Sequence, residues 1–176
     1  MPQSLSNLLV HLIFSTRLRE PVLDSDVRSE LHRYLITVLQ NHDCPPVQVG
    51  GTADHVHLLF ALSRTASIAK IVETLKTSSS KWLKTKGTDL AGFHWQAGYG
   101  AFSVSRSEAD RVSRYILEQE EHHKKVTFQE EYRRFLEKHG VAFDERYVWD
   151  RGVRERGVRP VPTSAPRWGA GFEGAA

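Results

Sequence analysis

Two histidines stand one residue apart in the stretch ADHVHLLF, residues 53–60. The apolar run around them, with two glycines upstream, is typical of a β-strand. Side chains on a strand alternate between faces, so we expect His55 and His57 to share one face. Two neutral imidazoles side by side are suitable ligands for a divalent metal. The alternative is two polar residues on the solvated face of a half-buried strand.

A tyrosine and a carboxamide occur further along, in RYILEQ, residues 114–119. Tyr115 and Gln119 are four residues apart, which places them on one face of a helix, and His122 continues that face. Gln119 would supply an oxygen ligand. A phenol with a pKa of about 10 is a weak nucleophile unless it is activated, and a metal on two imidazoles and an amide oxygen can polarise a phosphodiester. In-line attack by Tyr115 would form a phosphotyrosine and release a 3′-hydroxyl.

The elements that must position these residues are indicated by hydrophobic periodicity. Strands are predicted over 7–16, 46–51, 53–60 and 93–105, and helices over 25–42, 67–87, 107–125 and 127–140. Helix caps are expected at Asp24 or Ser25, at Ser67, at Ser107 and at a Thr127–Glu130 capping box. The order predicts an α+β fold with an antiparallel sheet of split βαβ, ferredoxin-like type, flanked by helices and followed by the tyrosine-bearing helix.

Composition limits the domain organisation and the partners. The 176 residues fit one domain, which we place in residues 1–150. The remaining segment, 151–176, is rich in Arg, Gly and Pro and is expected to be disordered. This tail carries five arginines and two glutamates, so it accounts for the net charge of +3 and leaves the first 150 residues neutral. Global charge therefore does not argue for DNA binding by the domain, and any basic surface there must be a local patch.

Cysteine content and hydropathy bear on the compartment. Cys44 is the only cysteine, which excludes an intrachain disulfide and a cysteine-rich zinc site. No run is long and apolar enough to suggest a membrane span, and the start of the sequence does not resemble a signal peptide. We therefore expect a cytoplasmic protein.

The ordered motifs resemble a known family. HVH is similar to the histidine–hydrophobic–histidine motif of the HUH nucleases, and YILEQ to the tyrosine–glutamine helix of the single-tyrosine transposases of small bacterial insertion sequences. HLIFSTRLREPVL, LKTSSSKW and WQAGYGAFSVS extend the resemblance over about residues 7–150. It implies that Tyr115 is the nucleophile and that His55, His57 and Gln119 hold the metal.

The resemblance also implies an activity and partners. Such an enzyme cleaves and rejoins single-stranded DNA through a 5′-phosphotyrosine, binds hairpins at the ends of a mobile element, and uses Mg²⁺ or Mn²⁺; we expect no zinc requirement. It implies a homodimer, in which the tyrosine helix can be exchanged between subunits. The sequence leaves a cis or a trans site open.

Other residues are weaker candidates. Lysines flank the apolar stripe of the helix over 67–87 and could contact phosphates, although a solvated face is the default. Trp95 could stack on an unpaired base. Tyr99, between two glycines, is either a rival nucleophile, a stacking platform or a structural residue. His11, His122 and His123 could reach the site but are expected to be structural or solvated. The DNA-binding candidates are therefore Lys70, Lys76, Lys81, Lys84, Trp95 and Tyr99.

Three other functions remain open from the sequence. Replication initiators and relaxases share the histidine pair, but relaxases commonly add a third histidine near it. A domesticated transposase relative that binds or processes chromosomal hairpin repeats would carry the same residues. A non-catalytic hairpin-binding regulator would not need the intact tyrosine, glutamine and histidine pair. Flanking hairpins and near-identical gene copies would identify a mobile element.

Overall fold

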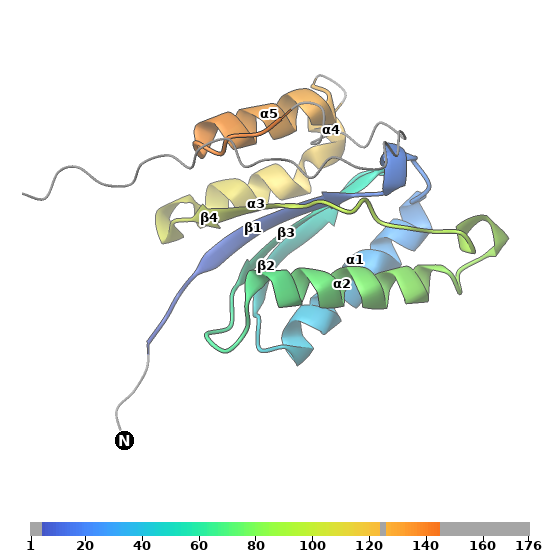
Figure 1. The fold of residues 1–176 in the computed structure, drawn as a ribbon, viewed down its shortest axis with the longest axis horizontal. Helices are drawn as coiled ribbons and strands as arrows, with labels where there is room; N and C mark the ends of the chain where they lie inside the picture. Colours follow the sequence, from blue (N-terminus) through green and yellow to red (C-terminus); the bar gives the residue numbers. More distant parts are fainter. Residues whose placement is uncertain (1–4, 124–125, 145–176) are drawn as a thin grey trace, which may run out of the picture.

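The fold is built on a four-stranded antiparallel sheet (Figure 1). The computed structural model describes residues 5–123 and 126–144. The strands β1 (Leu9–Ser15), β2 (Pro46–Gly51), β3 (His55–Ala61) and β4 (Gly100–Val104) lie in the spatial order β2-β3-β1-β4. This order and the α+β class confirm the predicted split βαβ sheet of ferredoxin-like type.

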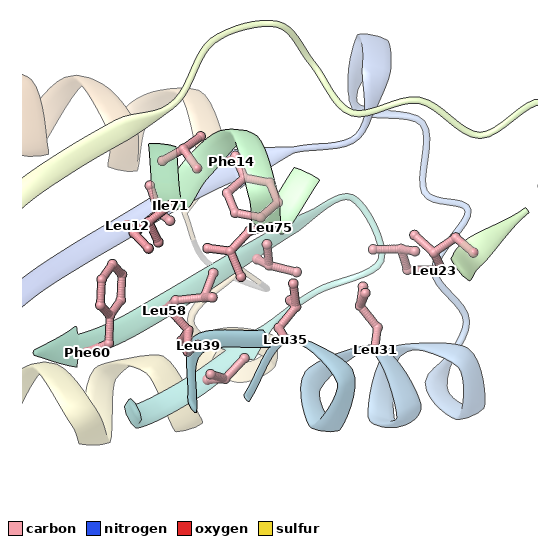
Figure 2. Packing of buried hydrophobic residues seen from close by; sticks show 14 of the residues in the cluster. Leu12, Phe14, Leu23, Leu31, Leu35, Leu39, Leu58, Phe60, Ile71 and Leu75 are labelled. Atoms are coloured by element: carbon pink, nitrogen blue, oxygen red, sulfur yellow. The ribbon is translucent and has the colours of Figure 1, made fainter. Parts of the chain in front are cut away.

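Two long helices cover one face of the sheet. α1 (Ser25–Asn41) is capped by the Asp24 side chain, which accepts hydrogen bonds from two backbone N–H groups, and α2 (Ile68–Leu83) is capped by Ser67. Both caps confirm the prediction from the sequence. Alternate residues of β1 and β3 face these helices and form the main core with leucines of α1 and α2 (Figure 2). The strand residues in this core are Leu12, Phe14, Val56, Leu58 and Phe60.

Three shorter helices, α3 (Ala109–Leu117), α4 (Gln119–His123) and α5 (Phe128–Lys138), lie on the other face (Figure 1). α3 packs tightly on β2 at Gly50. A Cβ at this position would lie 2.6 Å from the backbone oxygen of Ile116. The absence of a side chain at residue 50 is therefore what lets α3, which carries Tyr115, approach the sheet.

α5 begins at the predicted capping box. The Thr127 side chain accepts a hydrogen bond from the Glu130 backbone N–H, and the Glu130 side chain accepts one from the Thr127 backbone N–H.

The structure differs from the sequence prediction in three respects, which concern the strand predicted over 93–105 and the helix predicted over 107–125. The strand predicted over 93–105 is reduced to β4, because residues before Gly100 form a loop with one isolated bridge between Thr16 and Trp95. A 3-10 turn, η3 (Arg106–Glu108), precedes α3, so Ser107 is not its cap. The helix predicted over 107–125 is broken at Glu118, which separates α3 from α4. Two further 3-10 turns are η1 (Arg17–Arg19) and η2 (Thr88–Leu90).

The predicted domain boundary at residue 150 and the predicted disordered tail over 151–176 lie outside the described residues. Among the residues that are described, no helix combines the length and the apolar character that crossing a membrane requires.

Candidate active site

The two histidines of β3 share the sheet face that α3, α4 and α5 cover. In the antiparallel register His57 lies opposite Ile13 and His55 opposite Ser15, while Val56 and Leu58 point into the core on the other face. Both imidazoles are almost fully buried, with 1% of His55 and 0% of His57 exposed. The predicted shared face is confirmed. The alternative of a solvated face is wrong, because the second layer of helices covers it.

The Nδ1 atom of each of these histidines has a protein partner, so the Nε2 atoms point into the site. His55 Nδ1 lies 2.6 Å from the carboxylate of Asp54, to which it donates, and the Thr52 hydroxyl donates to the same oxygen over 2.8 Å. His57 Nδ1 lies 2.9 Å from Nε2 of His11 on β1. Such partners fix the tautomer and ring orientation of metal-binding histidines.

Burial keeps the rings of His57 and His11 neutral. Loss of hydration on burial lowers the pKa of His57 well below its usual value, with nearby histidines as a second cause, and lowers the pKa of His11 to about 3. Burial alone would raise the pKa of Asp54, but hydrogen bonds from His55 and Thr52 outweigh it and lower this pKa. Neutral imidazole is the form in which histidine binds metals, and a carboxylate partner orients such a ring.

Tyr115 and Gln119 come from α3 and α4 to the same place. Gln119 Oε1 lies 3.3 Å from His55 Nε2, while its amide nitrogen donates to the backbone oxygen of Tyr115 and to Glu131 Oε1. The Tyr115 ring stands edge-on to His57, with the ring centroids 5.9 Å apart. Its hydroxyl is buried and has no hydrogen-bond partner within the described part of the chain. The structure thus brings together Tyr115, Gln119, His55 and His57.

Two ligand candidates lie outside the set predicted from the sequence: Glu131 was not considered, and His123 was expected to be solvated although contact with the site was left open. His123 donates from Nδ1 to the backbone oxygen of Val126 over 2.9 Å, so its Nε2 faces Gln119 Oε1 at 3.0 Å and Glu131 Oε2 at 3.2 Å. Glu131 on α5 is only 4% exposed. The expectation that His123 is solvated is wrong. The available signal was a carboxylate three residues after Phe128, on the apolar face of a helix whose start is marked by the capping box.

The cluster consists of side chains that can accept a cation. One ligand atom from each of His55, His57, His123 and Glu131 lies within 4.8 Å of the others. Burial raises the pKa of Glu131 to about 8 and lowers the pKa of His123 to about 4, so burial opposes an ion pair between them. His57 Nε2 and Glu131 Oε2 are buried without a hydrogen-bond partner among the described residues. A divalent cation fits this donor set.

Lys76 does not lie in this site. Its ammonium donates to the backbone oxygens of Gln96 at 2.7 Å and Gly98 at 2.6 Å, and it lies over the rings of Phe14 and Tyr99. Burial lowers its pKa to about 8. Its observed contacts hold the loop before β4 in place.

The other predicted DNA contacts also lie away from the cluster. Trp95 is half-buried and donates from Nε1 to Ser79 over 2.9 Å, with its ring packed edge-on against Phe14 and Phe93. Tyr99 is 40% exposed beside β4. A surface groove on the α1–α2 layer, across the sheet from the histidines, includes Lys70 and Lys81, whereas Lys84 is exposed after α2. DNA contacts by Lys70, Lys81, Lys84, Lys76, Trp95 and Tyr99 stay predictions.

Comparison with known proteins places this geometry among transposases. The family described as "Transposase IS200 like" matches residues 4–119. The ISDra2 transposase TnpA of Deinococcus radiodurans is 25% identical over 114 residues, which cover 62% of this chain and 81% of the relative. The matched family region ends at Gln119, so His123 and Glu131 lie beyond it.

Two solved structures are similar. A putative transposase from Deinococcus radiodurans R1 superposes with a TM-score of 0.54 at 25% identity, covering 68% of this chain and 98% of that one. A REP-associated tyrosine transposase bound to a REP hairpin superposes with a TM-score of 0.50 at 12% identity, covering 81% and 74% of the two chains. The second match, at this low identity, shows a shared fold.

Proposed function

The chain belongs to the IS200-like transposase family, and from this premise we propose that it cleaves and rejoins single-stranded DNA through a covalent bond between Tyr115 and a 5′-phosphate. The observation that carries the proposal is the Tyr115 hydroxyl, which is buried beside His57 and has no hydrogen-bond partner in the described chain. Structural tyrosines usually find a partner for a buried hydroxyl. A hydroxyl kept free next to a potential metal site suits a nucleophile.

The proposed reaction is an exchange of one phosphoester for another. Tyr115 Oη bonds to phosphorus and loses its proton, while the bond from phosphorus to the 3′-oxygen breaks and that oxygen leaves as a 3′-hydroxyl. Attack on the phosphotyrosine by the 3′-hydroxyl of another strand reverses these changes and rejoins DNA without an external energy source. His55, His57 and Gln119 would hold a divalent ion, Mg²⁺ or Mn²⁺, which polarises the phosphodiester and offsets its charge.

The nucleophile is tested by trapping the covalent adduct. Single-stranded DNA from the flanks of the gene is incubated with protein, and the adduct is detected by its slower migration in a denaturing gel. We expect Tyr115→Phe to abolish the adduct while preserving the fold, because only the hydroxyl is lost. Tyr99→Phe is the matched control and should retain the adduct. Adduct formation by Tyr115→Phe but not by Tyr99→Phe would overturn the assignment.

The metal requirement is tested in the same assay. We expect His57→Ala to lose cleavage while binding hairpin DNA nearly as well as the wild type, since the His57 side chain is fully buried and cannot itself contact a hairpin on the surface. Excess chelator should stop cleavage by the wild type, and added Mn²⁺ should restore it. Full activity in chelator would contradict the metal role.

We propose single-stranded DNA next to a hairpin as the substrate. The proposal is supported by the similar structure of a REP-associated tyrosine transposase, which is bound to a REP hairpin. A duplex keeps its backbone helical and its bases stacked, which does not suit a site that must bend a single strand towards a buried tyrosine. The single-stranded substrate should be cut and its fully paired version should not.

We propose that the site is completed within one chain, although the resemblance allows exchange of the tyrosine helix in a homodimer. The supporting contacts are those of Gln119 with His55 and of Ile116 with Gly50 in the same chain. Coexpressed His57→Ala and Tyr115→Phe subunits provide the test. A cis site leaves every mixed dimer inactive, whereas an exchanged helix would restore one intact site.

A further inference from the structure

We infer that the segment after the family-matched region supplies two further metal ligands, His123 and Glu131, and that the completed site binds Mn²⁺ in preference to Mg²⁺ and fastens α5 to the sheet. The inference rests on the metal site of the proposed function and extends it with residues that the family match does not contain. It assigns to this segment a role in building the site.

The orientation of His123 leaves its ligand atom free for a metal. Because Nδ1 carries the proton donated to the Val126 oxygen, Nε2 of the neutral ring offers a lone pair. This lone pair faces Gln119 Oε1 at 3.0 Å. The amide of Gln119 cannot relieve the contact by turning over, since its nitrogen already donates to the Tyr115 backbone oxygen and to Glu131.

Glu131 brings a carboxylate to the same point. Its Oε2 lies 3.2 Å from His123 Nε2 and 3.9 Å from His57 Nε2, and it has no hydrogen-bond partner in the described chain. The Nε2 atoms of His123 and His57, the amide oxygen of Gln119 and a carboxyl oxygen of Glu131 therefore converge at one buried point. Atoms that accept hydrogen bonds are costly to bury together, and a divalent cation among them would offset that cost.

The helix that carries Glu131 is held over the histidines by aromatic packing. The centroid of the Phe128 ring lies 4.6 Å from that of the His55 ring. The centroid of the Phe135 ring lies 5.2 Å from that of His11 and 5.8 Å from that of Tyr115. A metal bound by the strand histidines and by Glu131 would link α5 directly to β3. Metal binding should therefore order α5 as well as fill the site.

The donor set also indicates which ion is preferred. Three imidazole nitrogens and one carboxylate suit first-row transition ions, whereas Mg²⁺ prefers oxygen ligands and retains water. The sequence alone, with two imidazoles and an amide oxygen, left Mg²⁺ and Mn²⁺ equivalent. The third imidazole favours Mn²⁺.

Calorimetric titration of the full chain with Mn²⁺ or Mg²⁺ alone, without DNA, tests the inference. We expect Glu131→Gln and His123→Gln each to weaken Mn²⁺ binding by at least about tenfold, a loss that even outer partners of metal ligands can cause. His123→Gln should also reduce the preference for Mn²⁺ over Mg²⁺. The control is Glu137→Gln, because Glu137 is exposed on the same helix, and it should bind Mn²⁺ as the wild type does.

Hydrogen exchange of the wild-type chain with and without Mn²⁺ provides a readout that does not depend on a variant folding, and Mn²⁺ should slow exchange of the α5 amides. The same measurement on Glu131→Gln is the comparison, and in that variant the protection should be absent. Unchanged Mn²⁺ affinity in both ligand variants, or no metal-dependent protection of α5, would overturn the inference and leave the proposed cleavage standing. Normal Mn²⁺ binding by a wild type that forms no adduct would instead contradict the proposed function alone.

Discussion

Gly50→Ala should displace α3, the helix that carries Tyr115. The added Cβ would meet the Ile116 backbone oxygen at 2.6 Å and its Cγ2 at 2.8 Å, whereas ordinary contacts of a Cβ begin near 3.4 Å. The first obstacle is backbone, which cannot turn aside as a flexible side chain can. Either α3 or β2 must therefore move.

The size of the movement follows from these distances. Restoring ordinary contact to the oxygen requires a shift of about 0.8 Å, and overpacking of this kind costs about 1–3 kcal/mol of folding free energy. Tyr115 is the residue before Ile116, so it moves with the helix. A displacement of about 1 Å at a reacting group can cost about 100-fold in rate. We expect cleavage to fall about 10- to 100-fold.

Two measurements separate the effect on stability from the effect on rate. Urea denaturation gives the loss of folding free energy, and adduct formation under conditions where the variant remains folded gives the rate. Gly92→Ala is the matched control, because a Cβ there would meet nothing within 4 Å, and it should leave both quantities nearly unchanged. A Gly50→Ala protein with wild-type stability and wild-type rate would refute the close packing of α3 on β2.

Three further changes test other parts of the structure. Lys76→Met removes an ammonium that donates to loop backbone oxygens, so we expect a loss of about 1.5–3 kcal/mol in urea denaturation and faster proteolysis in residues 96–98; an unchanged loop would contradict this role. Burial, with Arg28 as a second cause, lowers the pKa of His32 from 6.5 to about 4, so the unfolded chain binds a proton first and stability falls as pH drops from about 6.5 to 4. His32→Gln should flatten this fall in acid titrations, and an unaltered slope would count against it. Glu131→Met should raise the melting temperature of metal-free protein and remove the rise on adding Mn²⁺, because a buried carboxylate without its cation destabilises the fold; a lower metal-free melting temperature would argue the reverse.

The sequence predicted the parts of this site that depend on local geometry. Alternation along a strand is fixed by the backbone, so the shared face of His55 and His57 followed from their spacing alone. The caps at Asp24 and Ser67 and the capping box at Thr127 are likewise contacts between residues close in sequence. Each was visible because both partners lie within a few residues of each other.

The parts that were missed depend on how distant segments pack. On a continuous helix over 107–125, His123 was expected to be solvated with contact to the site left open, and the break at Glu118 is visible only in the fold. Trp95 was considered as a ring that could stack on an unpaired base, because its hydrogen bond to Ser79 on α2 cannot be seen from the strand pattern. Lys76 was considered as a phosphate contact beside the default of a solvated face, because the backbone oxygens that bind it belong to a loop twenty residues away.

The burial of the Glu131 carboxyl group links the stability of the fold to the proposed metal site. A carboxyl group that is only 4% exposed, packed near aromatic rings, weakens folding unless something compensates its lost hydration. The hydrogen bond from Gln119 satisfies one of its oxygens and leaves the other without a partner. Neither packing nor helix capping requires an acid here, because Glu130 already completes the cap. A cation shared with His55, His57 and His123 compensates the lost hydration of this carboxyl group. Glu131 is therefore costly for the stability of the metal-free fold and is explained by its role in metal binding.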